Sequence, residues 1–215
     1  MVQKSKVPNF EANRFVDVAH GFVLPPKPKG WPRQFHSVKH CIESAIHMAS
    51  QIELIDHSLT SFRPDQVRGG YFRASLTELC RVEDVTKLLG QQLSFKMSRD
   101  PSLHVVKLLR NYQVHIASSQ LDEGHTVVAL AGEPAVYRSF IAVNVSAAEL
   151  RGLDSARTYS DNQLEELVSL FEAQQRKLGI VQLLYHLAIR IEEFAKCALI
   201  FPSTRRSSVA REVRS

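Results

Sequence analysis

With 215 residues, 44% of them hydrophobic and 23% charged, the chain is long enough for one sizeable hydrophobic core, and its composition excludes a disordered protein. No apolar run approaches the roughly 20 residues that a membrane-spanning helix needs, so we expect no membrane segment. The formal net charge of +5 permits binding to a polyanion such as nucleic acid but does not require it.

The basic residues gather near the two ends of the chain. The first forty residues carry seven lysines and arginines against Glu11 and Asp17, and residues 203–215 carry four arginines against one glutamate. These ends are either solvated tails or electrostatic contacts for nucleic acid. The three cysteines are odd in number and widely spaced, and residues 1–15 lack the apolar stretch of a secretory signal, so we expect reduced thiols in a cytoplasmic protein.

The first part of the chain is predicted to be extended. Residues 21–35 hold four prolines and two glycines, and neither a helix nor a central strand can run through them. We therefore predict three regions: an N-terminal extension with a proline-rich arm at 1–35, a helical domain at 36–200, and a basic disordered tail at 201–215.

Two helical regions are predicted after the arm. Residues 36–59 repeat apolar side chains at intervals of three and four, which indicates one long helix. Pro64 interrupts the pattern, and the helical region that follows is expected to fall into two pieces, around Gly69–Gly70 or near Arg81.

The third predicted helix begins at Asp100 and Pro101, with Asp100 as its N-cap and Pro101 in the first turn. Its helical wheel carries two apolar strips, so it must pack on two sides. One side is the protein's own core, and the other is either another helix of the chain or a second copy of it. Arg110 projects among the residues of the second apolar strip. Between the strips runs a narrow polar stripe, formed by His104, Asn111, His115 and Ser118.

The remaining elements are a hairpin and a long helix. Residues 125–145 alternate in polarity, are rich in β-branched and aromatic residues, and contain a central Gly-Glu-Pro sequence, which predicts a β-hairpin. Ser160 and Gln163 fit a capping box at the start of a helix that reaches residue 200, with Gly179 as a candidate bend. The predicted fold class is mainly α: a helical bundle with a β-hairpin inserted before the last long helix.

The residues of the third helix suit the cleavage of RNA. A nuclease that needs no metal must take a proton from the 2′-hydroxyl, give one to the leaving oxygen and support the phosphate with a cation. Histidine transfers protons near neutral pH, and arginine offers a planar fork that matches two phosphate oxygens. Arg110 and His115 are therefore the candidate catalytic residues. The candidate supporting or phosphate-binding residues are Asn111, His104 and Ser118.

One copy of the chain lacks a second positioned proton-transfer group. Two copies that meet at a twofold axis would supply two imidazoles and two guanidiniums. The Arg-x4-His spacing by itself is weak, and it occurs again at Arg99 and His104, where Pro101 makes the pair straddle a helix start. Mid-helix placement and an asparagine directly after the arginine distinguish Arg110 and His115 from that second pair.

The sequence LHVVKLLRNYQVHIA, together with the helical segments before it, resembles the HEPN superfamily. The signature of that superfamily is an arginine, usually a polar residue, a short spacer and a histidine on a helix of an α-helical bundle. The resemblance covers about residues 36–118 and reaches to 160–200. It implies a homodimer whose two motifs line a cleft, and metal-independent endoribonuclease activity, for which we expect a 2′,3′-cyclic phosphate product.

The resemblance would assign Arg110 to phosphate binding, Asn111 to support and His115 to proton transfer. Many members act in toxin–antitoxin or phage-defence settings, so an antitoxin or another protein partner is a further expectation. Some toxins of the superfamily carry a modified tyrosine two residues after the histidine, but Ala117 stands at that place and such control is not expected. Other members have lost catalysis, so the alternative is a catalytically silent helical dimer that binds RNA or a partner protein.

Other candidate sites have simpler explanations. His36 and His40 stand four residues apart, the spacing of a metal pair, but no third ligand follows at a persuasive spacing. We therefore expect no metal and no cofactor. Tyr71, Phe72 and Arg73 could stack a base, although an anchored edge of the core is the simpler account. No nucleotide-binding or serine-hydrolase fingerprint is present in the sequence.

Overall fold

The computed structural model describes residues 18–19, 22–54, 62–91, 93–98, 100–115, 120–128 and 135–200. These residues form a mainly helical protein, as predicted, with two small antiparallel sheets, of which only the β3–β4 hairpin was predicted. The helices are α1 (His36–Gln51), α2 (Pro64–Leu88), α3 (Pro101–His115), α4 (Ala147–Arg151) and α5 (Asp161–Leu199), with short 3₁₀ turns η2 (Arg33–Phe35), η3 (Phe95–Met97) and η4 (Asp154–Ala156). Over this part of the chain, no helix has the length and apolar character needed to cross a lipid bilayer.

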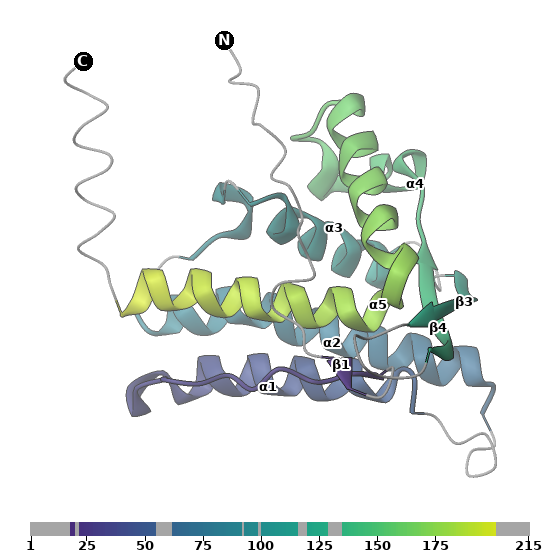
Figure 1. Ribbon diagram of the computed structural model, residues 1–215. Helices are drawn as coiled ribbons and strands as arrows, with labels where there is room; N and C mark the ends of the chain where they lie inside the picture. The colour runs from purple at the N-terminus through teal and green to yellow at the C-terminus, as the bar shows by residue number, and fades with distance from the viewer. Residues whose placement is uncertain are drawn as a thin grey trace, which may run out of the picture.

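The helices form two groups (Figure 1). α1, α2 and the C-terminal half of α5 run side by side, and α3 packs against α2 and α5. The N-terminal half of α5 stands at a steep angle to this group, with α4 beside it. Buried apolar side chains from all five helices form one continuous core between the two groups.

α2 is one unbroken helix, so the predicted interruption at Gly69–Gly70 or near Arg81 is wrong. Gly69 lies on the buried face of α2, and Phe72 and Leu76 continue that face with no exposed surface. Each glycine costs a helix about 1 kcal/mol, which burial of this long apolar face outweighs. The helix predicted at 36–59 is shorter in the structure, where α1 ends at Gln51. Residues 55–61 lie outside the described part.

The predicted hairpin begins earlier than expected. β3 spans Gln120–Val128 and pairs antiparallel with β4, which spans Val136–Asn144. Gly124 stands opposite Phe140, and a Cβ added to this glycine would lie 2.5 Å from the phenylalanine ring. The ring therefore covers the glycine, while the Gly-Glu-Pro sequence expected at the turn lies outside the described residues. A second sheet pairs β1 (Val18–Ala19) with β2 (Phe22–Val23), so a short strand that was not predicted lies at the start of the proline-rich segment 21–35.

The outer edge of β4 is held by a side chain of α5 instead of by a third strand. The backbone N–H of Val143 donates to Gln175 Oε1 at 2.7 Å, and Gln175 Nε2 donates to the Val143 carbonyl at 3.0 Å. Both side chains are buried, so this exchange satisfies backbone groups that no water could reach.

α5 bends sharply at Gly179, as the sequence suggested. Its backbone angles, φ 77° and ψ −169°, are open only to glycine, and they separate the two halves of the helix. A Cβ at this position would lie 2.7 Å from the Ile141 carbonyl oxygen. The bend therefore lets the helix pass β4 at close range and turn from one helix group to the other.

The helix starts follow the predicted caps. Asp100 Oδ1 accepts the Ser102 N–H at 3.0 Å and so caps α3, and Ser160 and Gln163 form the expected capping box of α5. The short α4 was not predicted. It starts with the same kind of box, in which Ser146 and Glu149 exchange hydrogen bonds, so a signal for it stood in the sequence.

The proline-rich arm lies along the C-terminal half of α5. Trp31 Nε1 donates to Glu192 Oε1 at 2.9 Å, and the Lys196 ammonium lies 5.4 Å from the centre of the indole ring. Lys196 also donates to the Lys29 carbonyl and pairs with Glu192. These contacts, which we call the arm clasp, tie residues 29–31 to the helical domain.

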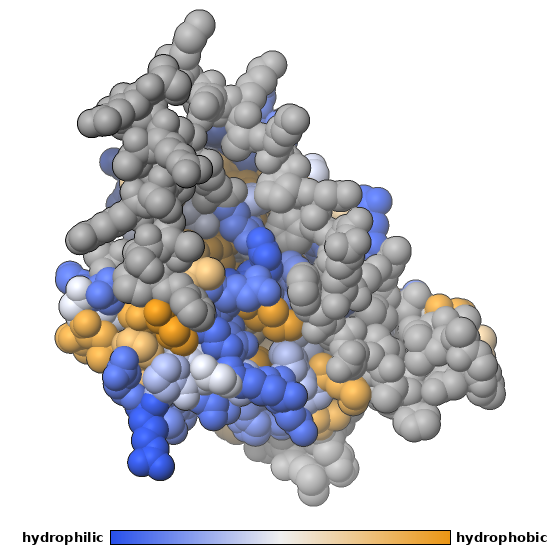
Figure 2. Space-filling view, turned by 60° about the vertical axis from the view of Figure 1, so that its left-hand side comes forward, coloured by the Kyte–Doolittle hydropathy of each residue, from blue (hydrophilic) through white to orange (hydrophobic). Residues whose placement is uncertain are grey.

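On the face shown in Figure 2, hydrophilic side chains cover most of the described surface, and smaller apolar areas lie between them. Large apolar side chains that stand exposed in the described residues include Leu88 and Met97 near the end of α2 and at η3. Scattered exposed apolar side chains are ordinary on globular proteins. The charged groups therefore carry more information about function than the apolar surface does.

Candidate functional site

α3 is buried on two sides by its own chain. On one side Val105 and Leu109 face a narrow space that Phe171 of α5 also lines. On the other side Val106 is fully buried, and its carbonyl oxygen lies 4.0 Å from Cys80 Sγ of α2. The sequence left open whether another helix of the chain or a second copy covers this side of α3. Helices of the same chain cover Val106, so no second copy is needed at this position.

Arg110 lies on the seam between α2 and α3, and its side chain is partly exposed. Its Nη1 donates a hydrogen bond to Asn111 Oδ1 at 3.1 Å, which fixes one side of the guanidinium. No carboxylate of the described residues forms an ion pair with Arg110. The remaining donors of its fork are thus available to an anion.

The neighbouring cation on α3 is arranged differently. Lys107 Nζ lies 2.5 Å from Glu83 Oε2 of α2, and both side chains are largely shielded from solvent. The same carboxylate accepts the Phe95 N–H at 2.6 Å through its other oxygen. Lys107 is therefore neutralised within the fold, whereas no carboxylate of the described residues compensates the charge of Arg110.

Cys80 lies beside Arg110 on the seam. Burial raises the pKa of the Cys80 thiol to about 12, helped by the charge of Glu83 and opposed by the charge of Arg110. The thiol therefore stays protonated at neutral pH and is not a nucleophile. The charge of Arg110 thus acts on a thiol of α2, across the seam between the two helices.

His104 uses both ring nitrogens inside the chain. Its Nε2 lies 2.8 Å from the Ser98 carbonyl oxygen, and its Nδ1 lies 2.5 Å from the hydroxyl of Tyr159. The Tyr159 ring meets the imidazole edge-on, and burial raises the pKa of its hydroxyl to about 12. His104 thus ties α3 to the end of η3 and to the turn before α5, with no ring nitrogen left over for a phosphate.

The other candidate residues stand near the end of α3. Asn111 is partly exposed one turn before His115, which is the last residue of the helix. The side chain of His115 and the whole of Ser118 lie outside what the structure describes, so their predicted roles stay predictions. Tyr112, inside the motif, is buried, and burial followed by the nearby Glu149 raises the pKa of its hydroxyl.

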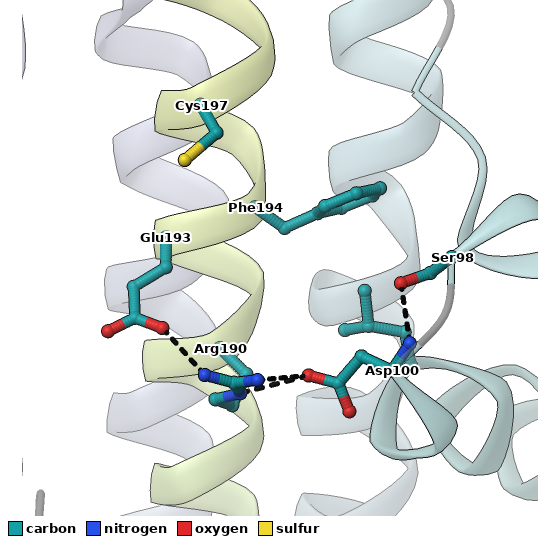
Figure 3. Close-up of a pocket in the computed structure, with 7 residues that line it drawn as sticks. Ser98, Asp100, Arg190, Glu193, Phe194 and Cys197 are labelled. Atoms are coloured by element: carbon teal, nitrogen blue, oxygen red, sulfur yellow. Dashed lines mark hydrogen bonds and ion pairs between the residues drawn. The ribbon is translucent and has the colours of Figure 1, made fainter. Parts of the chain in front are cut away.

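A second arginine site lies between α5 and the start of α3 (Figure 3). Arg190 Nε and Nη2 donate to Asp100 Oδ2 at 2.9 and 2.8 Å, and its Nη1 donates to Glu193 at 3.0 Å. Phe194 and Cys197 line the same open groove, whose volume is about 400 Å³. Two carboxylates already occupy the guanidinium, so this groove offers no free cation to an anionic ligand.

The other candidates from the sequence, the Tyr71–Arg73 segment and the His36–His40 pair, show no sign of a base-stacking or metal site in the described residues. Phe72 is fully buried, as the simpler explanation of the Tyr71–Arg73 segment predicted. His36 and His40 meet edge-on, and His40 Nδ1 lies 2.9 Å from Ser44 Oγ. In the portion of the chain that the structure describes, no three His, Cys, Asp or Glu side chains are grouped so as to hold a metal ion.

The sequence matches no protein-family model, and neither a curated protein nor a solved structure is significantly similar to it. The functional argument therefore depends on the residues of α3 and on what surrounds them.

Sequence patterns did not reveal two features of this region. The pairing of Lys107 with Glu83 joins positions 24 residues apart, and no local pattern links them. Arg73 was considered only for base stacking, whereas the structure places its guanidinium against Gly69 on the same side of α2 as β3. A helical wheel of α2 that marked cations next to the buried face would have singled out this arginine.

Proposed function

We propose that this protein is a metal-independent endoribonuclease of the HEPN type, with a site built around Arg110 and His115 at the end of α3 of a homodimer. One observation carries the proposal: Arg110 is partly exposed, lacks a carboxylate partner among the described residues, and is held by Asn111 on the helix that ends at His115. An arginine that the fold does not neutralise is suited to bind a phosphate.

The proposed reaction needs only proton transfers and phosphate binding. One imidazole removes the proton of the ribose 2′-hydroxyl, and the 2′-oxygen attacks the adjacent phosphorus. The bond to the 5′-oxygen breaks, and a second imidazole protonates that leaving oxygen. The products are a 2′,3′-cyclic phosphate and a 5′-hydroxyl. Arg110 binds the non-bridging phosphate oxygens as negative charge builds up on them.

Each polar residue of the motif has a distinct task in this proposal. His115 transfers the proton, and Asn111 keeps the Arg110 fork oriented. Ser118 is a further candidate donor to phosphate. His104 supports the site indirectly, because its two hydrogen bonds fix the first turns of α3.

A second copy of the chain supplies the second imidazole. Because Val105 and Val106 are already covered within one copy, the proposed contact is restricted to the C-terminal end of α3 and the chain that follows it. A cytoplasmic protein with an antitoxin or another protein partner, in a toxin–antitoxin or defence setting, fits such an activity.

The test is cleavage of RNA by the purified protein in the presence of EDTA. We expect cyclic-phosphate ends with the native chain and no cleavage with His115→Ala. His36→Ala is the matched control, since His36 is exposed at the start of α1, and it should cleave normally. Sedimentation of the native chain should show a dimer.

Absence of cleavage in every buffer, combined with binding of RNA or of a partner protein, would favour the catalytically silent helical dimer. Cleavage that survives in His115→Ala would contradict the assigned site. A strictly monomeric protein that still cleaves RNA would contradict the shared site between two copies.

A further inference from the structure

α2 and α3 run in opposite directions along their shared seam (Figure 1), and three contacts mark which parts of the chain meet along it. Near the end of α2, Glu83 pairs with Lys107. One turn earlier, Cys80 lies against the Val106 carbonyl. Near the start of α2, a Cβ on Gly69 would lie 3.9 Å from Leu121, which belongs to β3 after the end of α3. The later part of α2 thus meets the middle of α3, whereas the start of α2 meets β3, which follows α3, so the seam runs from the middle of α3 toward His115 as α2 is followed back to its start.

Arg73 occupies the part of this seam beyond Arg110. It stands seven residues before Cys80, or about 10 Å back along the helix axis at 1.5 Å per residue. His115 stands five residues after Arg110, or about 7.5 Å in the same direction. The backbone register thus places Arg73 alongside the end of α3 at which His115 is found.

The Arg73 guanidinium lies on the β3 side of α2. Its Nη1 would be 3.4 Å from a Cβ on Gly69, and Leu121 approaches the same point. The side chain is partly exposed, and among the described residues no carboxylate forms an ion pair with it. Asp122, which follows Leu121, instead accepts a hydrogen bond from Asn144.

Two other arginines, Arg81 of α2 and Arg63 at its N-cap, are neutralised, whereas Arg68 of α2 has no ion pair among the described residues and its buried Nε lacks a hydrogen-bond partner. Arg81 pairs with Glu78 at 3.4 Å, and Arg63 pairs with Asp65 at the same distance. The seam therefore carries two arginines, one from each helix, whose charges the described part of the fold does not compensate.

We infer that Arg73 and Arg110 form a two-arginine track that binds two phosphates of the same single-stranded RNA along the α2–α3 seam. The inference rests on the proposed function and adds a residue from a second helix to the site. Arg110 binds the phosphate at which the RNA is cut, and Arg73 binds a phosphate further along the strand on the His115 side. Two guanidiniums in a row would fix the direction in which the RNA lies along α3.

Salt-dependent binding tests the track separately from catalysis. The parent protein is the full chain with His115→Ala, which cannot cleave the probe, a fluorescein-labelled oligouridine RNA. Each phosphate contact contributes about −0.7 to the slope of log K against log salt concentration on a single strand. We expect Arg73→Gln to make this slope shallower by about 0.7 and to weaken binding about tenfold at low salt.

Arg81→Gln is the matched control, because it removes the same charge from the same helix on a side away from the seam. It should leave the slope unchanged. Adding Arg110→Gln to Arg73→Gln should make the slope shallower by about 1.4 in total. Circular dichroism melts of all variants check that α2 stays folded, since glutamine and arginine have similar helix propensities.

Three results would overturn the inference. If Arg110→Gln lowers the slope and Arg73→Gln does not, Arg73 is no phosphate contact, while the proposed nuclease site stands. If Arg73→Gln and Arg81→Gln weaken binding equally, the effect is one of net charge and not of a track. If the parent protein binds no RNA at any salt concentration, the proposed function and the track fail together.

Discussion

Arg110 and Arg190 lie on different helices of the same core, and the fold treats their charges in opposite ways. Arg190 is held by Asp100 and Glu193, and Asp100 also caps the start of α3. Arg110 receives only the amide oxygen of Asn111 from the described residues. The fold holds the Arg190 guanidinium between two carboxylates, whereas no carboxylate of the described residues holds that of Arg110.

This difference shows that the ion-pair partners of an arginine indicate its role better than the exposure of its side chain does. Both side chains are partly exposed, and both helices pack on the same core. A pairing with two carboxylates consumes most of the five N–H donors of a guanidinium. An arginine at a helix seam with no carboxylate opposite it either binds a ligand or has no function. Mutation of the arginine distinguishes these two cases.

The largest expected effect contrasts the two arginines directly. Arg110→Gln should lower RNA cleavage about 10³-fold, equivalent to about 4 kcal/mol of transition-state stabilisation, and leave the free energy of unfolding nearly unchanged. Arg190→Gln should show the reverse, with normal cleavage per folded molecule and a loss of about 1 kcal/mol in stability. Initial cleavage rates and urea unfolding measure the two quantities.

Two outcomes would break this contrast. Equal loss of stability in both variants would make Arg110 a structural residue like Arg190. Loss of cleavage in Arg190→Gln, with stability intact, would move the site to the groove at the start of α3.

The next effect concerns the bend of α5, whose C-terminal half carries Arg190 and whose N-terminal half packs on α3 through Phe171. Gly179→Ala should cost about 3 kcal/mol, because the added Cβ meets the Ile141 carbonyl and the positive φ strains the backbone. Gly90→Ala is the matched control, since Gly90 also has a positive φ but nothing lies within 4 Å of its Cβ position. It should cost only about 1 kcal/mol in urea unfolding.

A small difference between these two alanine variants would mean that α5 can straighten or shift away from β4. The bend would then not fix the position of the half of α5 that carries Arg190. The pairing of Arg190 with Asp100 could then not be attributed to a rigid α5.

The smallest effect is a pH dependence near Arg190. Burial, and after it the Arg190 charge, lowers the pKa of the His186 imidazole, while Asp100 acts in the opposite sense. The unfolded chain therefore takes up a proton at a higher pH than the folded one does. The contribution of His186 to the free energy of unfolding is fully present above about pH 6.5. It falls as the pH drops from 6.5 toward the lower pKa of the folded state.

Urea unfolding on both sides of pH 6.5 measures this dependence. His186→Gln should reduce the loss of stability on acidification, and the exposed His47→Gln should leave it as in the native chain. An unchanged pH dependence in His186→Gln would mean that the ring is protonated in the folded state as readily as in the unfolded one.

The sequence predicted those parts of the fold that local patterns encode. Asp100 with Pro101, and Ser160 with Gln163, placed the starts of α3 and α5 correctly because caps are short-range hydrogen bonds. Gly69–Gly70 misled the prediction, since the propensity of a glycine is local but the burial of α2 is decided by α1 and α3.

The candidate site could be predicted only in part, for the same reason. A helical wheel placed Arg110 and Asn111 on one helix, and the structure brings their side chains into contact. It could not show that Lys107 is neutralised by Glu83 or that both nitrogens of His104 are engaged, because those partners come from distant parts of the chain. Such tertiary pairings decide which polar residues of an amphipathic helix remain available.

The arm clasp has a consequence for spectroscopy. Trp31 is the only tryptophan of the 215 residues, and it packs between Glu192 and Lys196 on the outside of the helical domain. Intrinsic indole fluorescence of this protein therefore reports whether the arm is attached to α5, and tyrosine signals or circular dichroism report on the core. Detachment of the arm and melting of the core are two events that a single cuvette can distinguish.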